Sequence, residues 1–210
     1  MRFLTDHGNC EFRILDSIKD KISVEDQTNW AKTFVEIEHA GWKGKKGTSF
    51  ASDECATNYF DKSIKSWFAN GKLLALELVL DNVVIASLYV TIEKTEDVLI
   101  ARSQKTTYVE QYSKGSPGVH ALLHINKYLL DNHNFKFIDA CTTPDNDIIN
   151  AFMKQKQTTS SFLVSSNGTI NQKIFSFIHF LEISRINMRQ NIKILIHKLL
   201  SHKKRLSFNN

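Results

Sequence analysis

Residues 98–130 read VLIARSQKTTYVEQYSKGSPGVHALLHINKYLL, an apolar strand pattern followed by a glycine-containing loop and a helical pattern. Gly115, Pro117 and Gly118 interrupt regular structure just before the helical pattern begins. Backbone N–H groups at a helix N-terminus, preceded by glycines that allow close approach, form an anion site whose usual ligand is pyrophosphate. The stretch therefore predicts a strand, an anion-binding loop and a helix. An ordinary loop with proline at the start of a helix is the alternative.

The segments around this stretch alternate between helical and strand patterns. Asp81-Asn82 is a tight-turn signal between two runs rich in β-branched residues. In chain order we expect helices at 27–40 and 53–69, strands at 73–80, 83–92 and 98–108, a helix at 119–130, a strand at 135–142, a helix at 145–155 and a strand at 160–166. This order predicts an α/β fold with a mixed, partly antiparallel sheet flanked by helices.

The net charge of +5 is divided unevenly along the chain. Residues 174–210 carry seven basic side chains and one acidic one, which leaves 20 basic and 21 acidic side chains in residues 1–173. A nucleic-acid-binding core spreads Lys and Arg over a docking face, so a main body with a net charge of −1 disfavours nucleic acid as a partner.

The basic segment itself is predicted to be helical. Ile174 to Lys204 contains neither Gly nor Pro, and apolar residues recur along it at helical spacing. It reads as one long amphipathic helix or two short ones. Three roles stay open for it, which are packing on the main body, lying on an anionic membrane surface through 174–205, and forming a homodimer.

The three cysteines, Cys10, Cys55 and Cys141, are widely spaced and include no C-x-x-C pair. An odd number cannot complete a disulfide framework, and the spacing does not fit a cysteine-rich zinc site. The opening residues lack the pattern of a secretory signal, and no apolar run reaches the ~18 residues of a membrane-spanning helix. We therefore expect a cytoplasmic protein. If the basic segment lies on a membrane, the protein would be peripheral on the inner face of that membrane.

Two motifs carry a resemblance to a known family. The first is HAGWKGKKGTSF, which contains Trp42, Lys43, Gly44, Gly47 and Thr48. The second is the loop with Tyr108, Tyr112, Ser116, Pro117 and Gly118, in which Lys114-Gly115 is an insertion. Over residues 27–165 the chain resembles the GNAT-superfamily acetyltransferase domain of the BioF2-like or CelD (cellulose-biosynthesis) type, a relative of the FemAB transferases.

The resemblance implies a GNAT fold, which we expect in residues 27–170. Outside it we expect an N-terminal extension (1–26) and a basic helical tail (171–210), about which the resemblance says nothing. For the GNAT fold, the resemblance implies that acetyl-CoA or another acyl-CoA lies between two splayed parallel strands. Its pyrophosphate would be held by Ser113, Lys114, Gly115, Ser116, Pro117, Gly118 and Val119. The implied reaction is acyl transfer to an amine or hydroxyl of a small molecule, such as a cell-envelope sugar or polysaccharide precursor.

Candidate catalytic side chains each have a structural alternative. Asp139, in an apolar strand, is a candidate general base that could equally cap a helix or pair with a lysine. Tyr108 is a candidate acid that reprotonates the leaving thiolate, or a packing residue. Trp42 and Lys43 are candidate substrate-binding residues, and the lysines of that loop could attract an anionic substrate or cofactor. No metal site is predicted.

Two other functions remain as alternatives. One is a FemAB-like transferase that takes its acyl group from aminoacyl-tRNA, which the main body's charge of −1 disfavours because tRNA docking needs a basic face. The other is a shortened, non-catalytic lobe that serves as an interaction or membrane-recruitment module.

Overall fold

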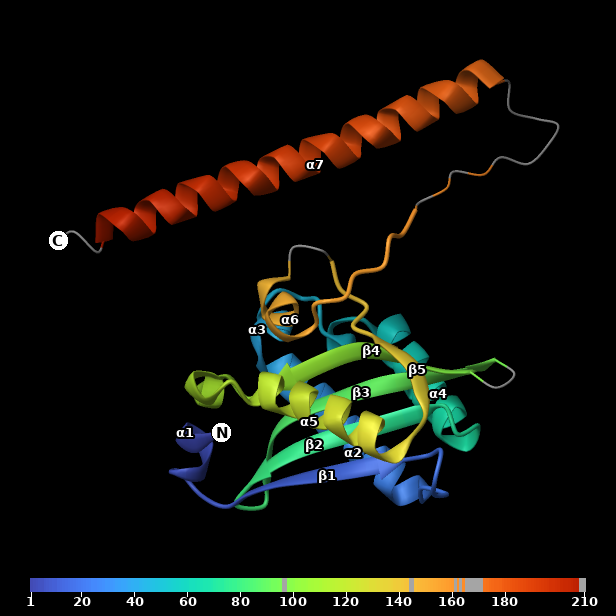
Figure 1. Ribbon diagram of the computed structural model, residues 1–210, viewed down its shortest axis with the longest axis vertical. Helices are drawn as coiled ribbons and strands as arrows, with labels where there is room; N and C mark the ends of the chain where they lie inside the picture. The colour runs from blue at the N-terminus through green and yellow to red at the C-terminus, as the bar shows by residue number, and fades with distance from the viewer. Residues whose placement is uncertain (96–97, 144–145, 161, 163, 165–171, 208–210) are drawn as a thin grey trace. The chain divides into compact units, whose positions relative to one another are not determined.

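The computed structural model describes residues 1–95, 98–143, 146–160, 162, 164 and 172–207 (Figure 1). Contacts within the chain divide it into two units, residues 1–154 and residues 155–210. Each unit is described by itself.

A five-stranded sheet forms the centre of the first unit, with its strands in chain order across the sheet. The first four strands are antiparallel, and the fifth runs parallel to the fourth. The strands are β1 (Cys10–Asp16), β2 (Leu73–Leu80), β3 (Val83–Thr95), β4 (Val98–Tyr108) and β5 (Phe135–Asp139). A parallel neighbour needs a crossover, and α5 (Pro117–Asn132) supplies it between β4 and β5.

Helices cover both faces of the sheet. α5 packs on one face, while α2 (Val24–Ala40) and α4 (Glu54–Ala69) pack on the other (Figure 1). The central strand β2 is therefore buried on both sides, which explains its almost continuous apolar sequence. The remaining short elements are α1 (Arg2–Thr5), α3 (Trp42–Lys45), η1 (Phe50–Ser52), η2 (Glu110–Gly115) and α6 (Asp147–Phe152).

Each face has its own hydrophobic cluster. On the α2 and α4 side, the ring of Trp30 packs against those of Phe34 and Tyr89, and the Trp30 indole N–H donates to the Ser87 hydroxyl at 3.0 Å. On the α5 side, a stripe along the helix that ends at Leu129 packs against alternate residues of the central strands. The cluster on the α5 side includes Leu99, Ala101 and Tyr108, so it fixes the position of β4 against this helix.

The expected mixed sheet flanked by helices is confirmed, and the expected strands from 73 to 142 form with similar bounds. The structure adds β1, which was not expected. It pairs with β2 at the edge of the sheet, so residues 1–26 contribute to the same sheet rather than preceding it. The strand expected at 160–166 falls mostly on residues outside the described ranges.

In the second unit, α7 (Gln172–Ser207) is one continuous helix. This agrees with the first of the two expectations for the basic segment, one long helix rather than two short ones. Its side chains include a pair between Glu182 and Arg185. No helix in the described part of the chain is long and apolar enough to cross a membrane.

Candidate cofactor and acceptor site

The parallel strands β4 and β5 separate partway along their length. Their pairing runs from Leu99↔Phe135 to Arg102↔Asp139 and stops there. β4 continues from Ser103 to Tyr108, and in the described part of the chain no strand pairs with that edge. A bulge at Gln104, where the β3 register shifts, lies just beyond the point of separation. An extended, amide-containing ligand can bind such an unpaired strand edge through backbone hydrogen bonds.

The loop after β4 leads into the N-terminus of α5. Ser116 precedes the helix in the left-handed conformation (φ 48°), and Pro117 occupies its first position. The carbonyl of Ser116 accepts the N–H groups of Val119 and His120. Gly118 is buried and lies in the first turn of α5, where a backbone N–H has no acceptor within the helix. Backbone N–H groups at a helix N-terminus can bind an anionic ligand oxygen.

Gly118 also sets how closely α5 approaches β4. A Cβ at this position would lie 3.3 Å from Cγ2 of Thr106 and 3.4 Å from the ring of Tyr108. The helix N-terminus is therefore held directly beside the unpaired edge of β4. The exposed Lys114 adds a positive charge to the same loop. These residues fit the pyrophosphate and pantetheine parts of an acyl-CoA.

Gly115, also predicted to bind the cofactor, has a packing reason of its own. It is buried, and a Cβ there would lie 2.5 Å from a methyl carbon of Leu4. Leu4 is fully buried, and the N-terminal amine of Met1 contacts the ring of His120. Burial and the positive charge of that amine lower the pKa of His120. The N-terminal helix α1 thus supports the loop from the protein interior.

Three of the predicted site residues come together at the far end of β4. Trp42, Lys43 and Tyr108 line one small cavity of about 20 Å³, enough for about one water molecule, together with Glu38, Gly41, Thr106 and Thr107. α3 reaches this position through a tight bend. A Cβ at Gly44 would lie 1.7 Å from the carbonyl oxygen of His39, so only glycine fits there.

Glu38 is the residue of this cavity that the sequence analysis missed. Its side chain is fully buried, and one carboxylate oxygen accepts from Lys105 Nζ (2.8 Å) and Lys43 Nζ (3.2 Å). The other oxygen accepts from the Phe50 N–H at 2.8 Å. Burial by itself would raise the pKa of Glu38, but the hydrogen bonds from Lys105 and Phe50 and the two lysine charges together lower it. Glu38 follows Trp30 and Phe34 at a spacing of four, and an acid in that apolar stripe was the available signal.

Asp139 lies elsewhere, at the point where β4 and β5 separate. Its carboxylate accepts from Arg102 Nη1 (2.9 Å) and from the Cys141 N–H (2.8 Å). Arg102 also donates two hydrogen bonds to Glu93. Asp139 therefore forms an ion pair, which was the structural alternative to a catalytic role, although its partner is an arginine and not a lysine. The role of Asp139 as a general base stays a prediction.

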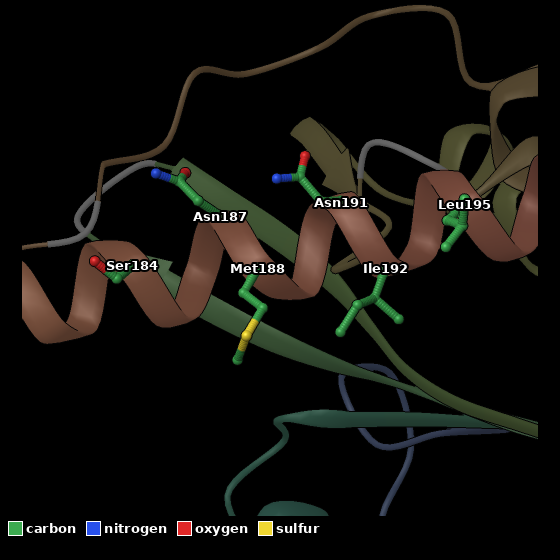
Figure 2. Close-up of a pocket in the computed structure, with 6 residues that line it drawn as sticks. All are labelled: Ser184, Asn187, Met188, Asn191, Ile192 and Leu195. Carbon is green, nitrogen blue, oxygen red and sulfur yellow. The ribbon is translucent and has the colours of Figure 1, made fainter.

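A larger hollow runs along α7 in the second unit. Figure 2 shows Met188 and Ile192 pointing to one side of the helix, and Asn187 and Asn191 to another. Every residue that lines this hollow belongs to the one helix. A single helix provides no opposite wall, so we place no small-molecule site there.

Solved structures of acetyltransferases share the fold of this chain. A probable acetyltransferase has 10% identity and a TM-score of 0.52, and the match covers 75% of this chain and 99% of that one. A possible acetyltransferase from Clostridium difficile 630 has 14% identity and a TM-score of 0.48, with 77% and 99% covered. AAC(6')-Iy, in complex with the bisubstrate analog CoA-S-monomethyl-acetylneamine, has 8% identity and a TM-score of 0.49, with 77% and 100% covered.

No family model matches the chain, and no curated protein matches it. The first of these structures shows the fold alone, a mixed sheet flanked by helices, which matches the GNAT-like fold expected from the sequence. The closer likeness to the BioF2-like and CelD type stays a prediction.

Proposed function

We propose that this protein transfers an acyl group from an acyl-CoA to an amine or hydroxyl of a small acceptor. The observation that carries this proposal is the separation of β4 from β5 after Arg102↔Asp139, beside the N-terminus of α5, where Gly118 packs against Thr106 and Tyr108. Together these features offer an open strand edge and an anion site on one continuous segment. The sugar or polysaccharide precursor as acceptor rests on the resemblance of the two motifs.

Acyl-CoA would supply the acyl group already activated as a thioester. In the proposal, the loop Ser113–Val119 binds the pyrophosphate and the edge of β4 orients the pantetheine arm, while backbone N–H groups beyond the bulge polarise the thioester carbonyl. The acceptor forms the new bond to the acyl carbon as the carbon–sulfur bond breaks. Asp139 is the candidate to take the acceptor proton, and Tyr108 to donate a proton to the sulfur.

Calorimetric titration with free CoA and acetyl-CoA tests the cofactor site. We expect saturable binding by the wild-type protein and about ten-fold weaker binding by Lys114→Glu, because reversing this exposed charge repels the pyrophosphate. Lys62→Glu is the matched control, since Lys62 is exposed on α4, away from the loop. Absence of binding at millimolar cofactor would overturn the proposal and leave the non-catalytic lobe as the better interpretation.

The candidate base has its own test. Asp139→Asn should reduce turnover while leaving the affinity for CoA unchanged, because the side chain keeps its shape at the strand separation. Full activity of this variant would remove Asp139 from the mechanism and leave its pairing with Arg102 as its role.

A second candidate function belongs to α7, which we propose to lie on an anionic membrane surface. Exposed apolar side chains follow the helix, and Arg189 provides a cation among them, while Arg185 is paired with Glu182. The exposed apolar residues are Ile174, Phe177, Ile178, Phe180, Leu181, Ile183, Ile186, Met188, Ile192 and Leu195.

Sedimentation with vesicles separates the three roles of this helix. The full chain should sediment with phosphatidylserine vesicles and not with phosphatidylcholine vesicles, and deletion of 174–210 should abolish sedimentation. A fall in melting temperature on deletion would instead indicate packing on the main body. A change from two copies to one in solution on deletion of 174–210 would indicate a homodimer.

A further inference from the structure

The group of charged side chains around Glu38, beside the small cavity at β4, carries one more positive charge than negative charge. Glu38 contributes one carboxylate, and Lys43 and Lys105 contribute two ammonium groups that share a single oxygen of it. The carboxylate has no exposed surface, while the side chains of Lys43 and Lys105 are 20% and 30% exposed. The two lysine side chains, unlike the carboxylate, therefore reach the surface, and Lys43 also lines the cavity.

The surroundings of the two lysines do not neutralise this excess. Lys43 Nζ also donates to the carbonyl of Thr106 at 3.5 Å, and Lys105 Nζ lies 3.5 Å from the centre of the Phe50 ring. Both contacts are with neutral groups. The remaining acid of this region, Glu110, is paired with Lys45 at 2.5 Å. Two partly buried ammonium groups that share one carboxylate favour binding of a further anion.

The position of this charge relates it to the acyl acceptor. The cavity is lined by Thr106, Thr107 and Tyr108, which belong to the unpaired part of β4, and by Trp42 from α3. Trp42 is 48% exposed, and Lys46 Nζ lies 4.9 Å from its ring centre. An exposed aromatic ring beside cations suits a ligand that has both a flat apolar surface and an anionic group.

Building on the proposed function, we infer that the acyl acceptor carries an anionic group, a phosphate or a carboxylate, which Lys43 and Lys105 bind on their exposed side, outside the small cavity. Glu38 holds the two ammonium groups together. The lysines then serve specificity, because an acceptor without the anion would leave the excess charge unpaired.

Titration of inorganic phosphate into protein saturated with free CoA tests this inference at constant ionic strength. Saturating CoA fills the pyrophosphate loop, so the remaining phosphate binding reports on a second site. We expect saturable binding that weakens about ten-fold in Lys43→Met and in Lys105→Met, the loss of one charge-assisted hydrogen bond. Lys62→Met removes the same charge from exposed α4 and should leave phosphate binding unchanged.

These variants are suited to the test because each leaves one lysine on Glu38, so the buried carboxylate stays paired and the protein should fold. Their melting temperatures check this directly. Absence of phosphate binding in the CoA-saturated protein, or binding unaffected by either variant, would overturn the inference. Weakened CoA binding in both variants would also overturn it, because the lysines would then serve the cofactor.

Failure of the proposed function gives a different result. In that case free CoA itself shows no saturable binding in the first titration, before any phosphate is added. Bound CoA without phosphate binding would leave the acyltransferase standing and reject only the anionic acceptor.

Discussion

Each face of the sheet buries one carboxylate, and the two differ in their partners. On the α2 face, Glu38 binds two lysine ammonium groups and a backbone N–H. On the α5 face, Asp16 accepts from the Tyr128 hydroxyl (2.9 Å), His133 Nε2 (2.7 Å) and the Ile18 N–H (2.9 Å).

The side chains that pair with Asp16 and with Glu38 differ in exposure. This difference indicates that Asp16 has a structural role and Glu38 a role in binding. The side chain of His133 is 6% exposed, so the Asp16 cluster is closed to solvent. The lysines of Glu38 are partly exposed, and together they carry more charge than the carboxylate neutralises. We therefore expect changes at Asp16 to affect stability alone, and changes at Glu38 to affect stability and anion binding together.

The largest effect should follow from Asp16→Ala, which removes the common acceptor of Tyr128 and His133 from the interior. We expect the free energy of unfolding to fall by about 3 kcal/mol, because buried partners are left unpaired. Urea unfolding followed by tryptophan fluorescence measures this, since Trp30 is buried in the same unit. The control is Asp61→Ala, which breaks an exposed pair with Lys65 on α4. An equal, small loss in both variants would contradict the prediction.

Glu38→Gln should give a smaller loss of stability and a gain in anion binding. Gln keeps the shape and can still accept from the Phe50 N–H, so we expect a loss of about 1.5 kcal/mol. Removal of the negative charge leaves two unneutralised lysines at the cavity, so phosphate should bind more tightly to the CoA-saturated variant than to the wild type. Asp16→Asn should leave phosphate binding unchanged, and a similar gain there would erase the distinction between the two carboxylates.

The pH dependence of unfolding gives a second test of Glu38. The pKa of Glu38 in the folded protein lies below its usual value of 4.5, so the unfolded chain binds the proton first as the pH falls. The stabilisation is therefore present above about pH 4.5 and is lost as the pH falls through the folded pKa. Glu38→Gln should remove this part of the pH dependence of unfolding. Identical acid profiles of the wild type and the variant would show that Glu38 contributes none of it.

The sequence predicted most of the fold because hydrophobic spacing reports which residues are buried. It missed β1 because Glu11 and Arg13 interrupt the apolar residues of this short edge strand. It missed Glu38 because its lysine on β4 is 67 residues away, and no local pattern reveals that pairing.

The glycine loop shows the same limit within the candidate site. Its spacing predicted an anion site, and the structure has Gly118 in the first turn of α5, beside the unpaired part of β4. Gly115, however, is explained by packing against Leu4, a contact that depends on where α1 folds. Local sequence thus indicated the loop, whereas the role of each glycine required the tertiary structure.

The smallest effect should come from Tyr128→Phe, which tests the Asp16 cluster from its partner's side. Burial, followed by the hydrogen bond to Asp16 and the negative charges of Asp16 and Asp20, raises the pKa of Tyr128 from 10.0 to about 12. The folded protein therefore keeps the phenol proton where the unfolded chain loses it. This stabilisation is present below about pH 10 and is lost as the pH rises toward 12.

At neutral pH we expect the Tyr128→Phe variant to lose about 1 kcal/mol, the net value of one hydrogen bond, with His133 and the Ile18 N–H still bound to Asp16. Unfolding measured between pH 9 and 11 should then fall less steeply for Tyr128→Phe than for the wild type. Equal slopes would show that the hydroxyl does not share its proton with Asp16, and the closed cluster would reduce to the contact between Asp16 and His133.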